Sequence, residues 1–455
     1  MQIKDFATNV RELLAQRDIV QLRALLEEAH PADIASCIEK LENSDIWRVL
    51  SSLPNERRTD VFGYLPPNEQ VRLAKSLNRR NLAEIFLHMS ADERADLYNR
   101  LEPDQQAALL PGLAHAERDD IRNLASHEEG TAGAIMTSDY ATLSPHLTAS
   151  QAIESLRHEA PDKETIYQAY VIDRSRHLLG TVSLRDLIVA SDDARVSGLM
   201  VEEVIASRVT DPQVEVVNKI SKYDLIALPI IDDQDRLVGI VTYDDAMDVA
   251  EQEATEDFHR VGTVGRLEES VREASVPLLY RKRIFWLLAL IFGNLLSGMG
   301  IAHYEATITA YVVLVFFLPL LIASGGNAGA QTATLMVRAL ATGDVQMRDW
   351  GRMIGRELAV AGLLGITMAV TVYFLGVARG GIHLAFVVAL TMVMVVVVGS
   401  LIGMSLPFLL SRFRLDPATA SVPLVTSIAD VTGVLIYFSI ATALLGVPLP
   451  ASTPT

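Results

Sequence analysis

The sequence predicts a multidomain protein in which an all-α superhelical N-terminal domain precedes two α/β domains in tandem and an α-helical membrane domain. Three observations predict this fold class. Apolar residues recur at helical spacing through residues 1–130, two similar strand–turn–strand–helix stretches lie within 131–250, and five apolar segments follow residue 280. Each apolar segment has at least the ~20 residues needed to cross a bilayer, so we expect five transmembrane helices within 280–448.

Residues 1–130 are predicted to form short helices stacked as a superhelix, because prolines occur where such helices would begin or end. The segment from Leu53 to Leu77 is echoed 36 residues later by the segment from Met89 to Leu113. Matching positions include Arg58 with Arg94, Pro67 with Pro103 and Gln70 with Gln106. A repeat of this length is typical of a helical solenoid, and a plain helical bundle is the alternative.

The stretches 169–187 and 227–246 are predicted to be two copies of one α/β unit. Val171-Ile172-Asp173 aligns with Ile230-Ile231-Asp232, and Gly180 aligns with Gly239 at a position where two backbones would approach closely. These features resemble tandem CBS domains, which implies a regulatory module at 131–250.

A hydroxyl residue precedes an aspartate by three positions at the end of each copy, as Ser183 and Asp186 and as Thr242 and Asp245. In CBS domains such a pair can hold a nucleotide ribose, so ATP binding stays open here. A helix capping box explains the same spacing and is favoured, because every such helix benefits from a cap.

Residues 244–262 are predicted to be one continuous helix, within a connecting segment 244–275 that leads to the membrane. Seven of the fourteen residues 244–257 are acidic and none is basic. Like charges one helical turn apart cost roughly 0.2–0.5 kcal/mol per pair, which divalent cations would relieve. A solvated acidic face is the commoner explanation of a charge run, but the place next to the membrane favours cation sensing.

The five predicted spans are 284–304, 306–337, 358–378, 380–411 and 422–445. Basic residues cluster at 281–283, 338–356 and 412–414, which all fall on one side of the membrane if the N-terminus is cytoplasmic. Only Arg379 lies on the other side. The N-terminus, MQIKDFATNV, has no apolar run and the single cysteine suits a reducing compartment, so residues 1–283 are predicted to be cytoplasmic.

Asp430 lies well inside the last apolar segment, eight residues after Val422 and roughly 12 Å into the bilayer. A charge at that depth costs at least ~2.5–3.5 kcal/mol, so it is expected to face a water-filled path or a cation. No basic residue lies within any span to neutralise it. A carboxyl group that is held protonated, as in a proton-coupled carrier, is the alternative.

The second span contains Ser324-Gly325-Gly326-Asn327, and a glycine pair of this kind can unwind a helix and aim carbonyl groups at a cavity. Close packing of small residues is the alternative. Asn327 and Gln331 are one turn apart, and we expect that face to look inward because amides in lipid are costly. With Thr426, which precedes Asp430 by one turn, they are candidate pore-lining residues. Oxygen ligands of this kind suit magnesium or calcium.

These pieces together resemble the MgtE family of bacterial magnesium channels over almost the whole chain. The specific segments are LIASGGNAGAQTATLMVRAL (321–340) and PLVTSIADVTGVLIYF (423–438). The resemblance implies a homodimer in the bacterial inner membrane, with a pore on the dimer axis that admits Mg²⁺ and a connecting helix that plugs it when cytosolic Mg²⁺ is high. It implies that Asp430 is the pore carboxylate. The sensing carboxylates that it implies are Asp92, Asp96, Asp224, Asp245, Asp248, Glu253, Glu256 and Asp257.

The leading hypothesis is therefore a Mg²⁺ channel that cytosolic Mg²⁺ closes. A proton- or sodium-coupled divalent cation carrier is the second hypothesis, and a membrane-anchored CBS nucleotide sensor that transports nothing is the third. An enzyme is not expected, because no nucleophile–base pair stands out. Residues 1–283 carry about −18 of the net charge of −17, and the membrane part carries about +1. This acidic part excludes nucleic acid as a partner, so the expected partners are Mg²⁺, a second copy and the lipid bilayer.

Overall fold

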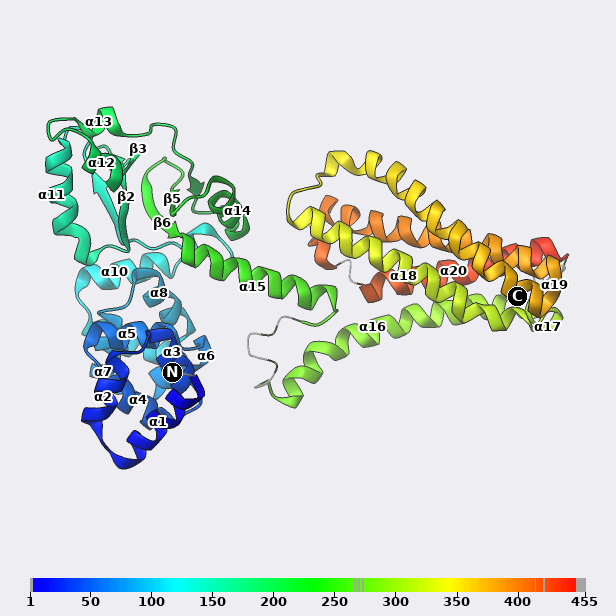
Figure 1. Ribbon diagram of the computed structural model, residues 1–455, viewed down its shortest axis with the longest axis horizontal. Coiled ribbons are helices and arrows are strands. Elements are labelled where there is room, and N and C mark those ends of the chain that lie inside the picture. Colours follow the sequence, from blue (N-terminus) through cyan, green and yellow to red (C-terminus); the bar gives the residue numbers. More distant parts are fainter. Residues whose placement is uncertain are drawn as a thin grey trace. The chain divides into compact units, whose positions relative to one another are not determined.

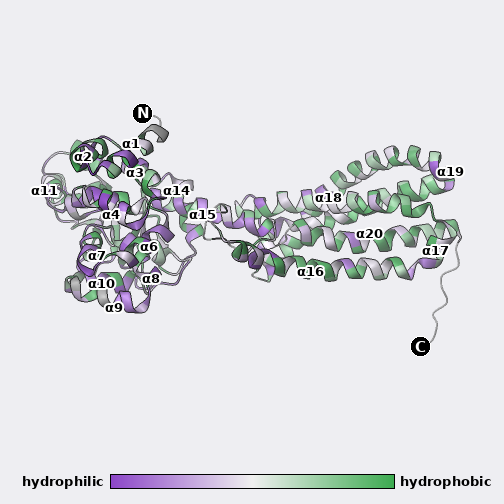
Figure 2. Cartoon of the chain, turned by 90° about the horizontal axis from the view of Figure 1, so that it is seen from below, coloured by the Kyte–Doolittle hydropathy of each residue, from purple (hydrophilic) through white to green (hydrophobic). Residues whose placement is uncertain are grey.

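The computed structural model describes residues 3–446 apart from 266, 268–270, 272–273, 414 and 420–421. Its chain divides into two compact units, residues 1–252 and 253–455. Figure 1 labels the elements along the chain, and Figure 2 shows that hydrophobic residues dominate the helices α16–α20, whereas hydrophilic and hydrophobic residues mix throughout the first unit.

The first unit begins with ten short helices whose apolar faces share one core. Its largest fully buried side chains include Phe62 and Phe86. Prolines occupy the first turns of α3, α6 and α9, where a missing backbone N–H costs nothing. The helices are α1 (Ile3–Gln16), α2 (Ile19–Glu27), α3 (Pro31–Ile38), α4 (Asn43–Ser51), α5 (Asn55–Gly63), α6 (Pro67–Ser76), α7 (Arg79–Phe86), α8 (Ala91–Arg100), α9 (Pro103–Leu109) and α10 (His115–Leu124).

The internal repeat is visible in the hydrogen bonds of this domain. The side-chain amide of Gln70 donates to the carbonyl oxygens of Gly63 (2.8 Å) and Leu65 (3.0 Å). The amide of Gln106, 36 positions later, donates to those of Tyr98 (2.8 Å) and Leu101 (3.1 Å). Each glutamine therefore satisfies carbonyl groups at the end of the preceding helix, which explains why the same residue recurs at this spacing.

Two similar three-stranded sheets follow, each with a parallel and an antiparallel pair. The first has the order β1-β2-β3 and the second the order β4-β5-β6. The strands are β1 (Tyr140–Leu143), β2 (Thr165–Ile172), β3 (Leu178–Ser183), β4 (Ser207–Arg208), β5 (Ala227–Ile231) and β6 (Leu237–Thr242). The flanking helices are α11 (Ala149–Glu159), α12 (Leu184–Val189), α13 (Val196–Leu199) and α14 (Gln213–Tyr223).

The two glycines aligned in the sequence hold equivalent places in these sheets. Gly180 pairs with Val171, and Gly239 pairs with Ile230. A Cβ atom on Gly180 would lie 2.9 Å from the carbonyl oxygen of Val201, and one on Gly239 would lie 2.5 Å from the Met136 sulfur. The prediction of a close backbone approach is therefore right for Gly180, whereas a side chain makes the approach at Gly239.

The Ser183 side chain caps the start of α12, as the favoured structural explanation requires. The Ser183 hydroxyl accepts a hydrogen bond from the Asp186 backbone N–H (3.0 Å) and donates one to its carboxylate (2.6 Å). Thr242 donates to the Asp245 carboxylate in the same way at the start of α15. Each hydroxyl thus has a structural role that requires no nucleotide.

The helical domain and the second sheet domain pack together within the first unit. Ala91 and Ala95 of α8 and Leu124 of α10 share a core with residues of the second sheet domain, among them Val216 and Val241. This contact brings α8 to the beginning of α15 (Tyr243–Val261) and so determines which carboxylates meet there.

Helix α15 ends at Val261. The Thr263 backbone has φ 55°, in the left-handed region, which interrupts a right-handed helix. Part of the expected connecting helix 244–275 lies outside the described residues. The next helix, α16, begins at Val276.

The second unit contains four helices that are long and apolar enough to cross a membrane, among the residues described. They are α16 (Val276–His303), α18 (Leu314–Ala341), α19 (Trp350–Arg412) and α20 (Val422–Leu445). The short helix α17 (Glu305–Ala310) lies before α18, so the predicted second span 306–337 begins with a separate turn of helix.

Helix α18 is continuous through Ser324–Asn327, which excludes the unwound alternative and leaves the close packing of small residues. Its glycines pack instead. A Cβ atom on Gly329 would lie 2.6 Å from the carbonyl oxygen of Gly399, and one on Gly403 would lie 2.0 Å from that of Gly329. Glycines four residues apart on α18 and α19 thus let the two backbones touch, as small residues do between membrane helices.

Helix α19 is a hairpin. Gly381 has non-helical angles (φ 80°, ψ −179°) in the middle of its 63 residues. On either side of this turn, Gly376 meets Ala385 and Gly365 meets Val393. The two halves, yellow and orange in Figure 1, therefore run antiparallel, one over the predicted third span and the other over the fourth.

Candidate cation sites

The first unit gathers five carboxylates at the contact of its domains, a set that we call the acidic cluster: Asp92, Glu93, Glu164, Asp244 and Asp245. Burial and then the charge of Asp92 raise the pKa of Glu93 to about 7 and that of Asp245 to about 8. Carboxyl groups with such pKa values repel one another when ionised, and a divalent cation would relieve that repulsion.

Three members of the cluster, Glu93, Glu164 and Asp244, were not among the sensing residues predicted from the sequence. Glu93 follows Asp92 on α8, and Glu164 precedes β2 of the first sheet domain. Desolvation and the charges of Asp92 and Asp244 raise the pKa of Glu164 to about 7. Glu93 stands beside a predicted ligand and could have been found by its position, whereas nothing in the sequence relates Glu164 to α8.

No ion pair among the described residues includes a member of this cluster, and the neighbouring Arg94 pairs with acids outside it. Arg94 lies 3.7 Å from the carboxylate of Asp120 and 3.6 Å from that of Asp139. The Asp92 Oδ1 atom is buried without a hydrogen-bond partner, and burial raises the pKa of this carboxyl group. Across the described residues, no three acidic, histidine or cysteine side chains converge on a ready-made metal site. A hydrated ion, which needs few direct ligands, fits such a cluster better than a dehydrated one.

The other predicted ligands of the first unit lie at more exposed positions. Asp96 faces solvent on α8 beside Arg100, and Asp248 is exposed one turn after Asp244 on α15. Repulsion adds to desolvation in raising the pKa of both carboxyl groups. Asp224 is exposed at the end of α14 with φ 51°, a left-handed conformation that aspartate tolerates, so its presence has a backbone explanation.

The remaining acids of α15, Glu253, Glu256 and Asp257, belong to the second unit, where the end of this helix contacts the membrane helices. Arg260 pairs with Glu256 and with Asp416, which precedes α20. Val261 packs near Val337 at the end of α18 and Ala418. Desolvation and the charge of Glu253 raise the pKa of Asp257.

Asp430 is half-buried on α20 and faces α18. A Cβ atom on Gly326 would lie 3.4 Å from the Asp430 Oδ1 atom and 3.4 Å from the Thr426 Cγ2 atom. Thr426 and Asp430 therefore share one face of α20, opposite a residue without a side chain. No ion pair of the described residues includes Asp430.

Asn327 and Gln331 are exposed on the single chain, so their face does not point into the core of this chain. The buried residues of α18 lie on other faces, where Gly325 and Gly329 meet α19 and Gly326 meets α20. Two amides one turn apart on an apolar helix need polar surroundings, which one chain does not supply.

A second carboxylate lies near the membrane part. Glu357, at the edge of the predicted third span, is the eighth residue of α19 and is half-buried. The Thr332 hydroxyl of α18 donates to its Oε1 atom at 2.8 Å. The apolar run begins only at Leu358, so the sequence predicts that this glutamate flanks the span and gives it no role in the site.

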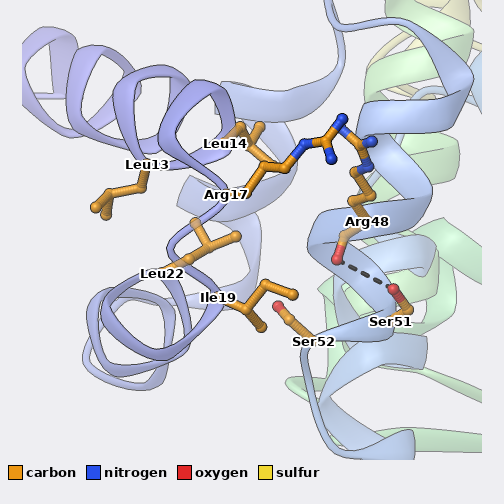
Figure 3. A pocket seen from close by; sticks show the side chains of 8 residues that line it. All are labelled: Leu13, Leu14, Arg17, Ile19, Leu22, Arg48, Ser51 and Ser52. Atoms are coloured by element: carbon orange, nitrogen blue, oxygen red, sulfur yellow. Dashed lines mark hydrogen bonds between the residues drawn. The ribbon is translucent and has the colours of Figure 1, made fainter.

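A cavity of about 310 Å³ in the helical domain is lined mainly by basic and apolar side chains, in contrast to the acidic cluster. Figure 3 shows Arg17 and Arg48 directed toward one another beside Leu13, Leu14 and Ile19. No acidic residue is among those that line it, so it does not resemble a cation site.

Three family models match the chain in succession. The MgtE intracellular N domain matches residues 29–130, the CBS domain matches 132–193 and 196–251, and a model described as divalent cation transporter matches 318–440.

Curated relatives match nearly the whole chain. The magnesium transporter MgtE of Thermus thermophilus is 38% identical over 446 residues, which cover 96% of this chain and 98% of the relative. The magnesium transporter MgtE of Bacillus subtilis is 30% identical over 95% of this chain and 96% of its own.

A solved structure of the cytosolic domain of the Mg²⁺ channel MgtE in complex with ATP is 37% identical, with a TM-score of 0.52. It covers 53% of this chain and 99% of the solved chain. The identity and coverage of these relatives, together with the three matched domains, show that the chain belongs to the MgtE family of magnesium transporters.

Proposed function

We propose that this protein conducts Mg²⁺ across the bacterial inner membrane along a path that includes Asp430. The observation that carries the proposal is the half-buried Asp430 carboxylate, which faces Gly326 and forms no ion pair among the described residues. An unpaired carboxylate on a membrane helix attracts cations, and its hard oxygen atoms suit Mg²⁺. The proposal agrees with the names of the relatives.

The chain is proposed to cross the membrane five times, with the hairpin α19 crossing twice. Support comes from Gly381 and from the antiparallel contacts on either side of it. Five crossings with a cytoplasmic N-terminus place the arginine-rich ends of α18 and α19 on the cytoplasmic side, as the positive-inside rule requires.

A homodimer is proposed to bring two copies of Asp430 to one pore. Asn327 and Gln331 support this proposal, because both amides are exposed on a single chain. A second copy would enclose them in a polar path together with Thr426, and two carboxylates would hold one hydrated ion.

Cytosolic Mg²⁺ is proposed to close the channel. The proposed ligands are the sensing carboxylates that the family resemblance implies, together with Glu93 and Glu164: Asp92, Glu93, Asp96, Glu164, Asp224, Asp245, Asp248, Glu253, Glu256 and Asp257. The ion pairs of Arg260 support a role for α15 as the plug, since Asp416 lies directly before the helix that carries Asp430.

ATP is proposed to bind the tandem CBS domains. The related cytosolic domain of the Mg²⁺ channel MgtE was solved in complex with ATP, which supports the proposal. Ser183 and Asp186 are the proposed ribose contacts. They bond to one another, so a nucleotide would have to share the Asp186 carboxylate.

The proposal is tested by Mg²⁺ flux into liposomes that contain the purified protein. Asp430→Asn keeps the size of the side chain and removes its charge, and Asp430→Ala also removes the oxygen atoms. We expect both variants to lose about tenfold or more of the flux, since each 1.4 kcal/mol of lost cation stabilisation is a factor of ten. Thr432→Ala on the same helix is the control.

Full Mg²⁺ flux through correctly folded Asp430→Ala would refute the role of this residue. A flux that follows the proton or sodium gradient at fixed voltage would instead support the coupled carrier. An absence of flux from the parent protein at every Mg²⁺ concentration would leave the nucleotide sensor as the better description.

A further inference from the structure

A groove of about 520 Å³ lies where the two ends of α19 come together. Trp350 lines it from the beginning of the helix, and Ile402, Leu409 and Arg412 line it from the end. Ile428 of α20 completes the wall, and Ser405 is one of the few polar groups in it. The groove is therefore mostly apolar and has one basic residue, Arg412, in its wall.

The two residues that distinguish this groove are those found where a bilayer meets water. Tryptophan concentrates at the level of the lipid headgroups, and arginine extends its charged end toward them while its stem covers apolar surface. Trp350 is 45% exposed and Leu409 is 51% exposed, so a lipid can reach both. Arg412 takes part in no ion pair among the described residues, which leaves its guanidinium open to an anion.

We propose that this groove binds one anionic phospholipid of the cytoplasmic leaflet. The headgroup phosphate accepts hydrogen bonds from Arg412 beside Trp350, and an acyl chain lies along Ile402, Leu409 and Ile428. Basic pockets between membrane helices on the cytoplasmic side recognise lipids in this way. The inference rests on the proposed orientation of α19, but it requires no ion conduction.

The apolar wall argues for a lipid rather than a free anion. A phosphate ion would use only Arg412, whereas an acyl chain also covers the exposed apolar residues. The groove also reaches the helix of the proposed pore, since Ile428 lies two residues before Asp430 on α20. A lipid that contacts Ile428 therefore touches the helix of the proposed pore.

The test is native mass spectrometry of the full-length protein in detergent, titrated with phosphatidylglycerol or with phosphatidylcholine of the same chains. We expect one phosphatidylglycerol per chain to bind more tightly than phosphatidylcholine. Arg412→Gln should weaken phosphatidylglycerol about fivefold and leave phosphatidylcholine unchanged. Arg352→Gln removes the same charge two residues after Trp350, on the other side of the helix, and should change neither. Glycerol phosphate, the headgroup alone, should not bind at these concentrations.

Equal weakening by Arg412→Gln and Arg352→Gln would overturn the proposal, because it would indicate a diffuse charge effect. Ser405→Trp fills the groove and keeps Arg412, so unchanged binding of phosphatidylglycerol to this variant would also overturn it. Ser405→Cys, in a protein with Cys37→Ser, tests the rival occupant. A disulfide between two copies through position 405 would mean that a second chain covers the groove.

Discussion

The acidic cluster of the first unit and Asp430 of the second use carboxylates in opposite ways. In the cluster, burial and then the charges of neighbouring acids raise the pKa values of Glu93, Glu164 and Asp245, so the strain of buried charge is spread over a domain contact. Around Asp430, glycines bring the helices together, and the single carboxylate faces Gly326 of α18, which has no side chain. We expect several buried acids to make folding depend on the cation concentration, whereas a single acid can bind a passing ion and release it.

The comparison is tested most strongly at the acids of α15. Replacing Glu253, Glu256 and Asp257 by their amides removes ligands that we propose to act only in the closed state. A ligand shifts an equilibrium only by its differential affinity for two states, so closure should need about tenfold more Mg²⁺ or more. Flux at graded cytosolic-side Mg²⁺ measures this shift.

The matched control for that triple variant is the amide replacement of Glu202 and Glu203, two exposed acids in the loop after α13. It should leave the closing concentration unchanged. If the triple variant closes at the parental concentration, these acids are a solvated face of the helix and the two regions differ less than we propose.

The glycine packing of the second unit is tested by Gly403→Ala. The new Cβ atom would lie 2.0 Å from the Gly329 carbonyl oxygen, so the helices must separate at a cost of about 1–3 kcal/mol. Gly362→Ala, on the same helix with nothing within 4 Å, should cost little. The unfolding midpoints of the two variants in detergent measure this difference. Equal midpoints would contradict the close packing of Gly403 on Gly329.

The acidic cluster is tested by pH in the presence of a chelator. Folding raises the pKa of Asp245 from 3.8 to about 8 and that of Glu93 from 4.5 to about 7. The folded state therefore binds more protons than the unfolded state, and stability should fall as the pH rises from about 4 to about 8.

Millimolar Mg²⁺ should reduce that fall, because it replaces the lost protons as the counter-charge. Asp92→Asn removes the charge that both groups feel and should reduce the pH dependence even without Mg²⁺, although burial still raises both pKa values. The thermal midpoint of the first unit, followed by scanning calorimetry of the full chain, gives the readout. A midpoint that is constant over this pH range would show that folding does not raise these pKa values.

Local pattern was enough to predict much of the fold. The period of 36 residues predicted equivalent helices, and the hydrogen bonds of Gln70 and Gln106 show why it exists. The paired glycines predicted two equivalent sheets, which the register of Gly180 and Gly239 confirms. These features depend on contacts within a repeat, so the sequence carries them directly.

Features that depend on distant segments were missed or misread. Glu164 meets Asp92 only because one domain packs on another. The glycines of α18 fit an unwound helix as well as a packed one, and only the facing glycines of α19 decide between them. Asn327 and Gln331 are exposed on this chain, and only the proposed second copy would enclose their amides in a polar path.

The hairpin of α19 has a consequence for how the chain can be altered. Its direction reverses at Gly381 alone, and Arg379 lies over the Phe316 ring at 4.6 Å beside that turn. We expect an epitope tag or protease site inserted at this tight turn to separate the two packed halves of α19. The connection 342–346 between α18 and α19 should tolerate the same insertion better.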